Sequence, residues 1–397
     1  MSYIVVLVLI AFIGMIAESS ASLHASLQQQ IYYLTFAAVV IWCTIKYAIG
    51  PDIQFYIPFY SGLQSPRYVL SHLNESPSEP GFTIFCSILH TCGISFWSMT
   101  AIISIFYFAV IFQLFKRIQG HRTLALLMLV CLDYNLILME FRQCLAVSFF
   151  YLFILLSERR QYGWAVLMAI LSASMHKSAI IVLVLFGLLY LVGKVRVSTK
   201  EYILLAVLII GLLFIPLHPL LLKMVEMLPL SATQLTSAKH HLMIGVPFQK
   251  ILIVYLSSIF CLAYYSIPKE GDTRRHWIVW CGVALLVCLY PYWFLLNRLR
   301  SFFLPFLIVY IANTIQSSEK KDVLTKQIYA TILVMYSVVL MIDIPQKNKQ
   351  LRSPTDSISL VVERCKHSEK ELQKRQMAQA ELYWDYDYKE MIKRGQQ

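Results

Sequence analysis

The feature that most constrains this sequence is a series of apolar segments that recurs along most of its length. A helix needs about 20 apolar residues to cross a bilayer. The segments that approach or meet this length lie at approximately 3–17, 31–49, 94–115, 124–140, 143–157, 163–176, 178–193, 202–222, 250–268, 277–296, 301–315 and 328–344. Because lipid offers backbone groups no hydrogen-bond partner, the pattern predicts an all-α polytopic integral membrane protein with about 12 transmembrane helices.

Composition agrees with this prediction. The chain is 58% hydrophobic and only 14% charged, whereas soluble domains carry about 25% charged residues. The first apolar run has no basic leader and no small-residue cleavage site, so we expect it to be a retained helix and not a signal peptide.

The chain divides into a transmembrane domain at 1–344 and a charged soluble tail at 345–397, which we expect to be helical. Within the first part, 50–80 and 223–249 are rich in polar and turn-forming residues and are predicted to be exposed loops. Gly81 to Thr91 is apolar but too short to cross the membrane, which favours a re-entrant or interfacial helix.

Lys and Arg gather in every second short loop, the pattern of cytoplasmic loops. These basic loops lie near 116–122, 159–160, 194–200, 269–275 and 320–326. The opposite, extracytoplasmic face would then carry both long loops and the turns near 140–143, 176–177 and 297–300. Cytoplasmic loops also explain the formal charge of +12, so we expect no nucleic-acid partner.

Arg142 is the first candidate for chemistry, in a turn between two apolar segments with Glu140 beside it. Alone, such an arginine can extend to lipid headgroups while the glutamate neutralises it. The alternative is suggested by other cations expected at the same face, namely Lys46, Lys177, Arg298 and Arg300. Together with Arg142 they would bind a diphosphate, because guanidinium groups pair phosphate oxygens bidentately.

His176 is the first choice for a general base, since an imidazole changes protonation near neutral pH. Its alternative role is an interfacial hydrogen bond. Asp52 and Glu140 are second choices, because a carboxylate flanked by cations stays ionised and is a weak base. Asp52 after Gly50 and Pro51 also fits a tight turn.

We expect no cofactor and no resident metal. The nine cysteines contain no C-x-x-C pair, and the histidines lack partners at metal-ligand spacing. The alternative is a Mg²⁺ ion held by Asp52 and Glu79, since hard cations take oxygen ligands.

Four short motifs follow one another in the first half of the chain: Lys46 to Tyr56, Glu79 to Phe82, Phe141-Arg-Gln-x-Leu-Ala146 and His176-Lys-Ser-Ala179. In this order they resemble the EpsG branch of the Wzy-type polysaccharide polymerases. Asn297 to Pro305 is similar to the family's late segment of arginines and aromatics. The chain differs in having Lys46 where the family usually has Arg, and in having Pro51 before Asp52.

The resemblance implies a bacterial enzyme of the cytoplasmic (inner) membrane that acts on its extracytoplasmic, periplasmic face. It would join undecaprenyl-diphosphate-linked oligosaccharide units into O-antigen, capsule or exopolysaccharide without a nucleotide sugar. Membrane lipids and a co-polymerase that sets chain length are the further partners implied. We expect Tyr56, Gln143 and Glu79 to contact the glycan. A flippase for the same lipid-linked unit and an O-antigen ligase are the alternatives.

Overall fold

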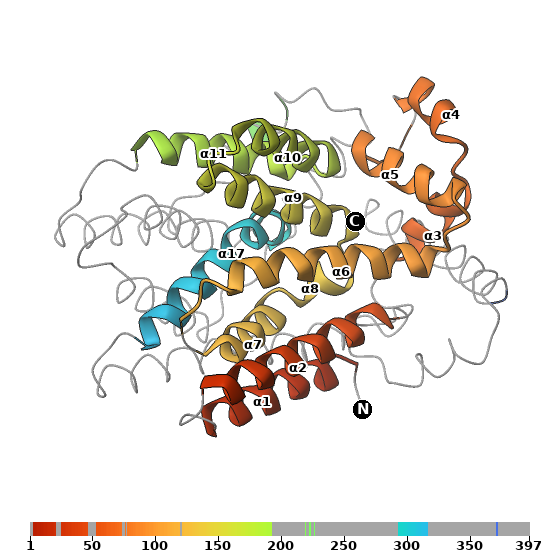
Figure 1. Ribbon diagram of the computed structural model, residues 1–397. Helices are drawn as coiled ribbons and strands as arrows, with labels where there is room; N and C mark the ends of the chain where they lie inside the picture. The colour runs from red at the N-terminus through yellow and green to blue at the C-terminus, as the bar shows by residue number, and fades with distance from the viewer. Residues whose placement is uncertain are drawn as a thin grey trace. The chain divides into compact units, whose positions relative to one another are not determined.

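A computed structural model describes residues 3–20, 25–46, 53–73, 78–119, 121–192 and 293–316, with a few single residues elsewhere (Figure 1). Every regular element in these ranges is a helix, which confirms the all-α prediction for the described residues. The helices are α1 Tyr3–Ser20, α2 Ala25–Thr44, α3 Ile53–Ser61, α4 Pro66–Ser71, α5 Pro80–Thr91, α6 Phe96–Phe115, α7 Arg122–Leu132, α8 Tyr134–Leu138, α9 Phe141–Glu158, α10 Tyr162–Met175, α11 Ser178–Val192 and α17 Trp293–Gln316.

Two of the described helices, α6 and α9, are long and apolar enough to cross a membrane. Shorter apolar helices occupy Val5–Ser19, Arg122–Leu132, Tyr162–Met175 and Ser178–Leu188. Almost all of the apolar segment 202–222, the segments 250–268 and 328–344, most of 277–296 and almost all of the charged tail lie outside the described residues. The number of spans therefore stays a prediction.

The chain forms two compact units, each considered separately. The first contains 1–116, 121–177 and 337–397, and the second contains 117–120 and 178–336. Helices α1 to α10 belong to the first unit, and α11 packs with α17 in the second.

Aromatic contacts fix the directions of α2, α6 and α9 in the first unit. The ring centroids of Phe36 and Phe108 are 5.8 Å apart, and those of Tyr32 and Phe112 are 6.1 Å apart. The earlier residue of α2 thus meets the later residue of α6, so these two helices are antiparallel. Helices α6 and α9 are parallel, with ring centroids 6.2 Å apart for Phe96 and Phe141 and 5.2 Å apart for Phe106 and Phe149. The end of α2 and the starts of α6 and α9 therefore lie at one end of the bundle.

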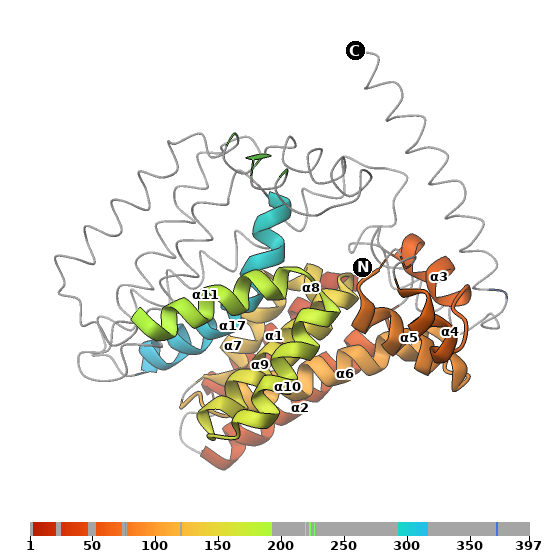
Figure 2. The same cartoon turned by 90° about the horizontal axis from the view of Figure 1, so that it is seen from above.

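Helix α10 runs back along α9, and Figures 1 and 2 both show the two side by side. Their register is marked by the Ser172 hydroxyl, which donates to the Ala146 carbonyl at 2.6 Å. The end of α10, with His176, thus lies at the same end of the bundle as the start of α9. We call this the site end. The basic residues Lys116, Arg122, Arg159 and Arg160 are at the opposite helix ends.

The structure corrects three predicted boundaries. The segment 50–80 is not an irregular loop, since α3 and α4 form within it. Helix α3 forms because Tyr56, Ile57 and Tyr60 share one face, which is buried. The apolar segment 124–140 is not one helix, because α7 ends at Leu132 and α8 begins after Asp133. Aspartate favours such breaks by competing for backbone hydrogen bonds.

The third correction concerns the turn predicted at 297–300. Helix α17 is continuous from Trp293 to Gln316, so Arg298 and Arg300 lie within a helix. Arginine is a good helix former, and two flanking apolar runs can therefore belong to one helix.

Candidate active site

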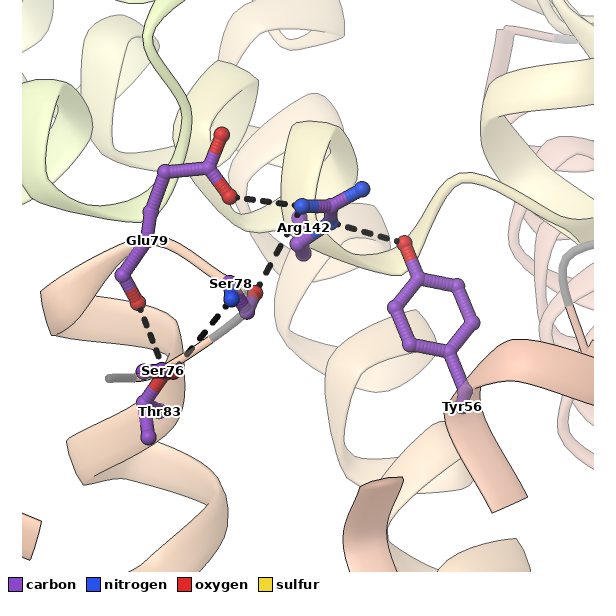
Figure 3. Close-up of polar contacts among 6 residues, drawn as sticks. All are labelled: Tyr56, Ser76, Ser78, Glu79, Thr83 and Arg142. Atoms are coloured by element: carbon purple, nitrogen blue, oxygen red, sulfur yellow. Dashed lines mark hydrogen bonds and ion pairs between the residues drawn. The ribbon is translucent and has the colours of Figure 1, made fainter. Parts of the chain in front are cut away.

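Arg142, in the first turn of α9, is held by side chains from two other parts of the first unit (Figure 3). Its Nη1 lies 2.8 Å from Oε2 of Glu79 and 3.5 Å from Oγ of Ser78. Its Nε donates to the hydroxyl of Tyr56, on α3, at 3.1 Å. The three contacts fix the plane of the guanidinium group.

Glu79 is placed by the start of α5. It is the residue before the helix, and Pro80 at the first helical position suits the fixed backbone angle needed there. The carbonyl of Glu79 accepts from the Thr83 N–H and hydroxyl, each at 3.0 Å. The carboxylate is thus attached to the start of a helix, and the Glu79 side chain is only 9% exposed.

Helix α5 also packs closely on the end of α10. A Cβ on Gly81 would collide with the Ser174 side chain, 2.7 Å from its Cβ, and would lie 2.9 Å from its carbonyl carbon. Only glycine permits this approach, so the Gly81–Ser174 contact sets Glu79 beside the α10 terminus that carries His176.

An aromatic wall supports the arginine. The ring centroid of Tyr56 lies 5.2 Å from that of Phe141 and 5.7 Å from that of Phe82. The Cζ atom of Arg142 lies 5.8 Å from the ring centroid of Phe55 and 5.7 Å from that of Tyr56. Rings at this distance attract the cation and limit its movement.

One edge of the guanidinium is left open. Arg142 is 20% exposed, and its Nη2 makes no hydrogen bond with any residue that the structure describes. Two N–H donors are therefore available to an external ligand. A phosphate oxygen suits them, because charge-assisted hydrogen bonds from arginine to phosphate are short and strong.

His176 directly follows α10 with extended backbone, and it is buried. Ser172 on α10 is hydrogen-bonded to Ala146 on α9. His176 lies one helical turn after Ser172, and Arg142 lies one helical turn before Ala146. Since α9 and α10 are antiparallel, these two turns lie side by side, and His176 is at the level of Arg142. Lys177, the next residue, is exposed.

The remaining predicted residues of the first unit have varied surroundings. Lys46 and Gln143 are buried, and Glu140 is partly exposed just before α9. Tyr56 and Glu79, predicted to contact glycan, are buried partners of Arg142 instead of open surface. Their contacts to a glycan stay predictions.

Arg298 and Arg300 lie in the second unit, where Arg298 is partly exposed and Arg300 is buried in α17. Their convergence with Arg142 stays a prediction, and Asp52 falls outside the described residues. Within the described ranges, no group of three or more His, Cys, Asp or Glu side chains could hold a metal ion.

Sequence reasoning missed Ser78, and it did not connect Phe55 with Arg142, although both contact the Arg142 side chain. Each is adjacent to a residue that was singled out, Glu79 or Tyr56. Their contacts with Arg142 join separate parts of the chain, which a local sequence pattern does not reveal.

Comparison with known proteins gives one result for most of the chain. The EpsG family model matches residues 31–354, a range that contains every candidate residue named above. Neither curated proteins nor solved structures gave a match. The chain belongs to the EpsG family, a Wzy-like family of polysaccharide polymerases.

Proposed function

We propose that this protein polymerises undecaprenyl-diphosphate-linked oligosaccharide units at the extracytoplasmic face of a bacterial cytoplasmic membrane. The product would be an O-antigen, a capsule or an exopolysaccharide. The observation that carries the proposal is Arg142, held on one edge by Glu79 and Tyr56 and open at Nη2. Membership of the EpsG family supports the polymerase reaction.

In the proposed reaction the growing chain is the donor. The acceptor hydroxyl oxygen forms a bond to the anomeric carbon, and the bond from that carbon to the lipid diphosphate breaks. The diphosphate leaves with the electron pair and gains negative charge. Arg142 stabilises this charge, since a preorganised cation does not have to reorient during the reaction. Lys177, Arg298 and Arg300 are the further cations of the proposal.

The acceptor proton goes to His176. Histidine suits this task because its two protonation states are both accessible near neutral pH. Glu79 is assigned no proton transfer, because its carboxylate is already occupied by the 2.8 Å ion pair with Arg142. The role of Glu79 is instead to orient the guanidinium group.

The test is reconstitution of purified protein with lipid-diphosphate-linked units from its own host and no nucleotide sugar. We expect the wild type to produce a ladder of repeats on a gel, and Arg142→Ala to lose about 10²–10³ in rate. Arg67→Ala is the matched control, because Arg67 is an exposed arginine on α4, a helix that packs on α5. The control should give the wild-type ladder.

Two outcomes would contradict the proposal. Movement of the intact unit across vesicles with no change in length would identify a flippase. Transfer of finished glycan to a different acceptor, with no ladder, would identify a ligase.

A further inference from the structure

Lys46 is a cation in the interior of the first unit, and the polymerase reaction proposed above gives it no role. It is 1% exposed. Its Nζ donates to the carbonyl of Ile137, on α8, at 2.8 Å and to the hydroxyl of Ser104, on α6, at 3.1 Å. The buried ammonium thus has oxygen partners on two helices, which offsets part of the cost of removing it from water.

The same ammonium group lies 4.8 Å from the ring centroid of Phe141, the first residue of α9. Lys46 therefore touches both sides of the short link between α8 and α9. On one side it binds a carbonyl in the last turn of α8, where carbonyls lack helical partners. On the other it lies against the ring that immediately precedes Arg142.

Phe141 carries this contact onward to the site. Its ring packs 5.2 Å from Tyr56, whose hydroxyl accepts a hydrogen bond from Arg142 Nε at 3.1 Å. A continuous set of contacts therefore runs from Lys46 through Phe141 and Tyr56 to the guanidinium.

We propose that Lys46 is a positioning residue that fixes the α8–α9 link and thereby places Arg142, and that it does not bind the donor diphosphate. This inference depends on the proposed function for its kinetic consequence. The exposed fractions of the two residues support the inference. Lys46 is 1% exposed and is therefore out of reach of a ligand, whereas the Arg142 side chain is 20% exposed.

A double-mutant cycle separates positioning from direct binding. Lys46→Met removes the charge and keeps most of the side-chain volume. In the wild-type background we expect kcat/KM for the lipid-linked donor to fall about 10- to 100-fold, as for other small displacements of a catalytic group. In an Arg142→Ala background, we expect Lys46→Met to lower kcat/KM by less than about a further twofold. The low activity of this background is measured with radiolabelled donor at high enzyme concentration.

A direct contact between Lys46 and the diphosphate predicts a different result. The double mutant would then lose activity by the product of the factors measured for Lys46→Met and Arg142→Ala alone. General unfolding by Lys46→Met would also lower activity by the same factor in both backgrounds. Either multiplicative result overturns the proposal. Lys116→Met is the matched control: Lys116 also lies against a phenylalanine ring, 4.9 Å from Phe112, but at the opposite end of the bundle. Its activity should equal that of the wild type.

A second measurement does not depend on activity. Backbone hydrogen exchange of Met139 to Cys144 should become about 10-fold faster in Lys46→Met and stay unchanged in Lys116→Met, because local opening follows the loss of local contacts. Unchanged exchange in Lys46→Met overturns the proposal. Should Arg142→Ala retain full polymerisation, the assigned role of Arg142 fails, and the exchange result alone then decides whether Lys46 fixes the link.

Discussion

The ion pair between Arg142 and Glu79 matters more for orientation than for stability. For a largely buried pair, the cost of removing both charges from water offsets much of their attraction, and here Arg142 is 20% and Glu79 9% exposed. What the pair provides is a fixed plane: Glu79 and Ser78 hold Nη1, Tyr56 holds Nε, and Nη2 stays open.

Glu79→Gln tests this role, because it keeps an acceptor oxygen and removes the charge. Charge-assisted hydrogen bonds are about twice as strong as neutral ones. We expect kcat to fall about tenfold, equivalent to about 1.4 kcal/mol, with the midpoint of thermal unfolding nearly unchanged. Glu158→Gln, at the end of α9 remote from the site, is the control and should keep the wild-type rate. A fully active Glu79→Gln would show that the carboxylate charge is not needed.

Single residues were predicted better than their partners. Arg142, Glu79 and Tyr56 could be selected because each is polar or aromatic near the end of an apolar run. The contact of Arg142 with Glu79 spans 63 residues of chain. Side-chain pairing at that separation depends on helix packing, which local pattern does not contain. The buried setting of Lys46 could not be predicted for the same reason.

At the scale of helices, apolar length predicted α6, α9, α10 and α11 to within two residues at each end. It failed at the break between α7 and α8 and at the continuous α17, because hydropathy reports environment and not backbone continuity. Apolar length also missed α3. This helix is short and almost wholly apolar and aromatic, so no alternation of apolar and polar residues marks its buried face.

The contact of α5 with α10 gives an element-scale prediction. Gly81→Ala places a methyl group against Ser174, and overpacking of this kind costs about 1–3 kcal/mol. We expect a lower thermal midpoint and a reduced kcat, because Glu79 moves relative to His176. Ser174→Gly in the same chain should recover part of both losses, since it removes the side chain that the methyl group meets. No recovery would mean that the contact does not set this register.

A second element-scale prediction concerns the end of the bundle opposite the site. The buried Glu18 carboxylate accepts hydrogen bonds from the N–H, at 3.0 Å, and the hydroxyl of Thr123, so that α1 caps the start of α7. Glu18→Ala leaves these donors unsatisfied, at a cost of about 1–3 kcal/mol in unfolding free energy. Activity per folded molecule should be unchanged. A selective loss of kcat would contradict the separation of this end from the site.

At the scale of the molecule, the basic residues of the predicted cytoplasmic loops gather at one end of the first unit. Lys116, Arg122, Arg159 and Arg160 lie at one set of helix ends, and Arg142 and His176 lie at the other. Cytoplasmic loops retain basic residues. The separation therefore predicts that the site end faces away from the cytoplasm, where the lipid-linked donor is proposed to be used.

Cysteine labelling in intact cells measures this orientation. Cys92 is exposed between α5 and α6 at the site end, so a membrane-impermeant maleimide should label a variant that keeps Cys92 as its only cysteine. A second variant, with Cys86 as its only cysteine, should not react, because Cys86 is buried, burial raises its pKa and thiolate is the reactive form. The matched variant has Arg159→Cys as its only cysteine, at the opposite end, and should be labelled only after the cells are opened. The reverse pattern would place Arg142 on the cytoplasmic side and exclude polymerisation outside the membrane.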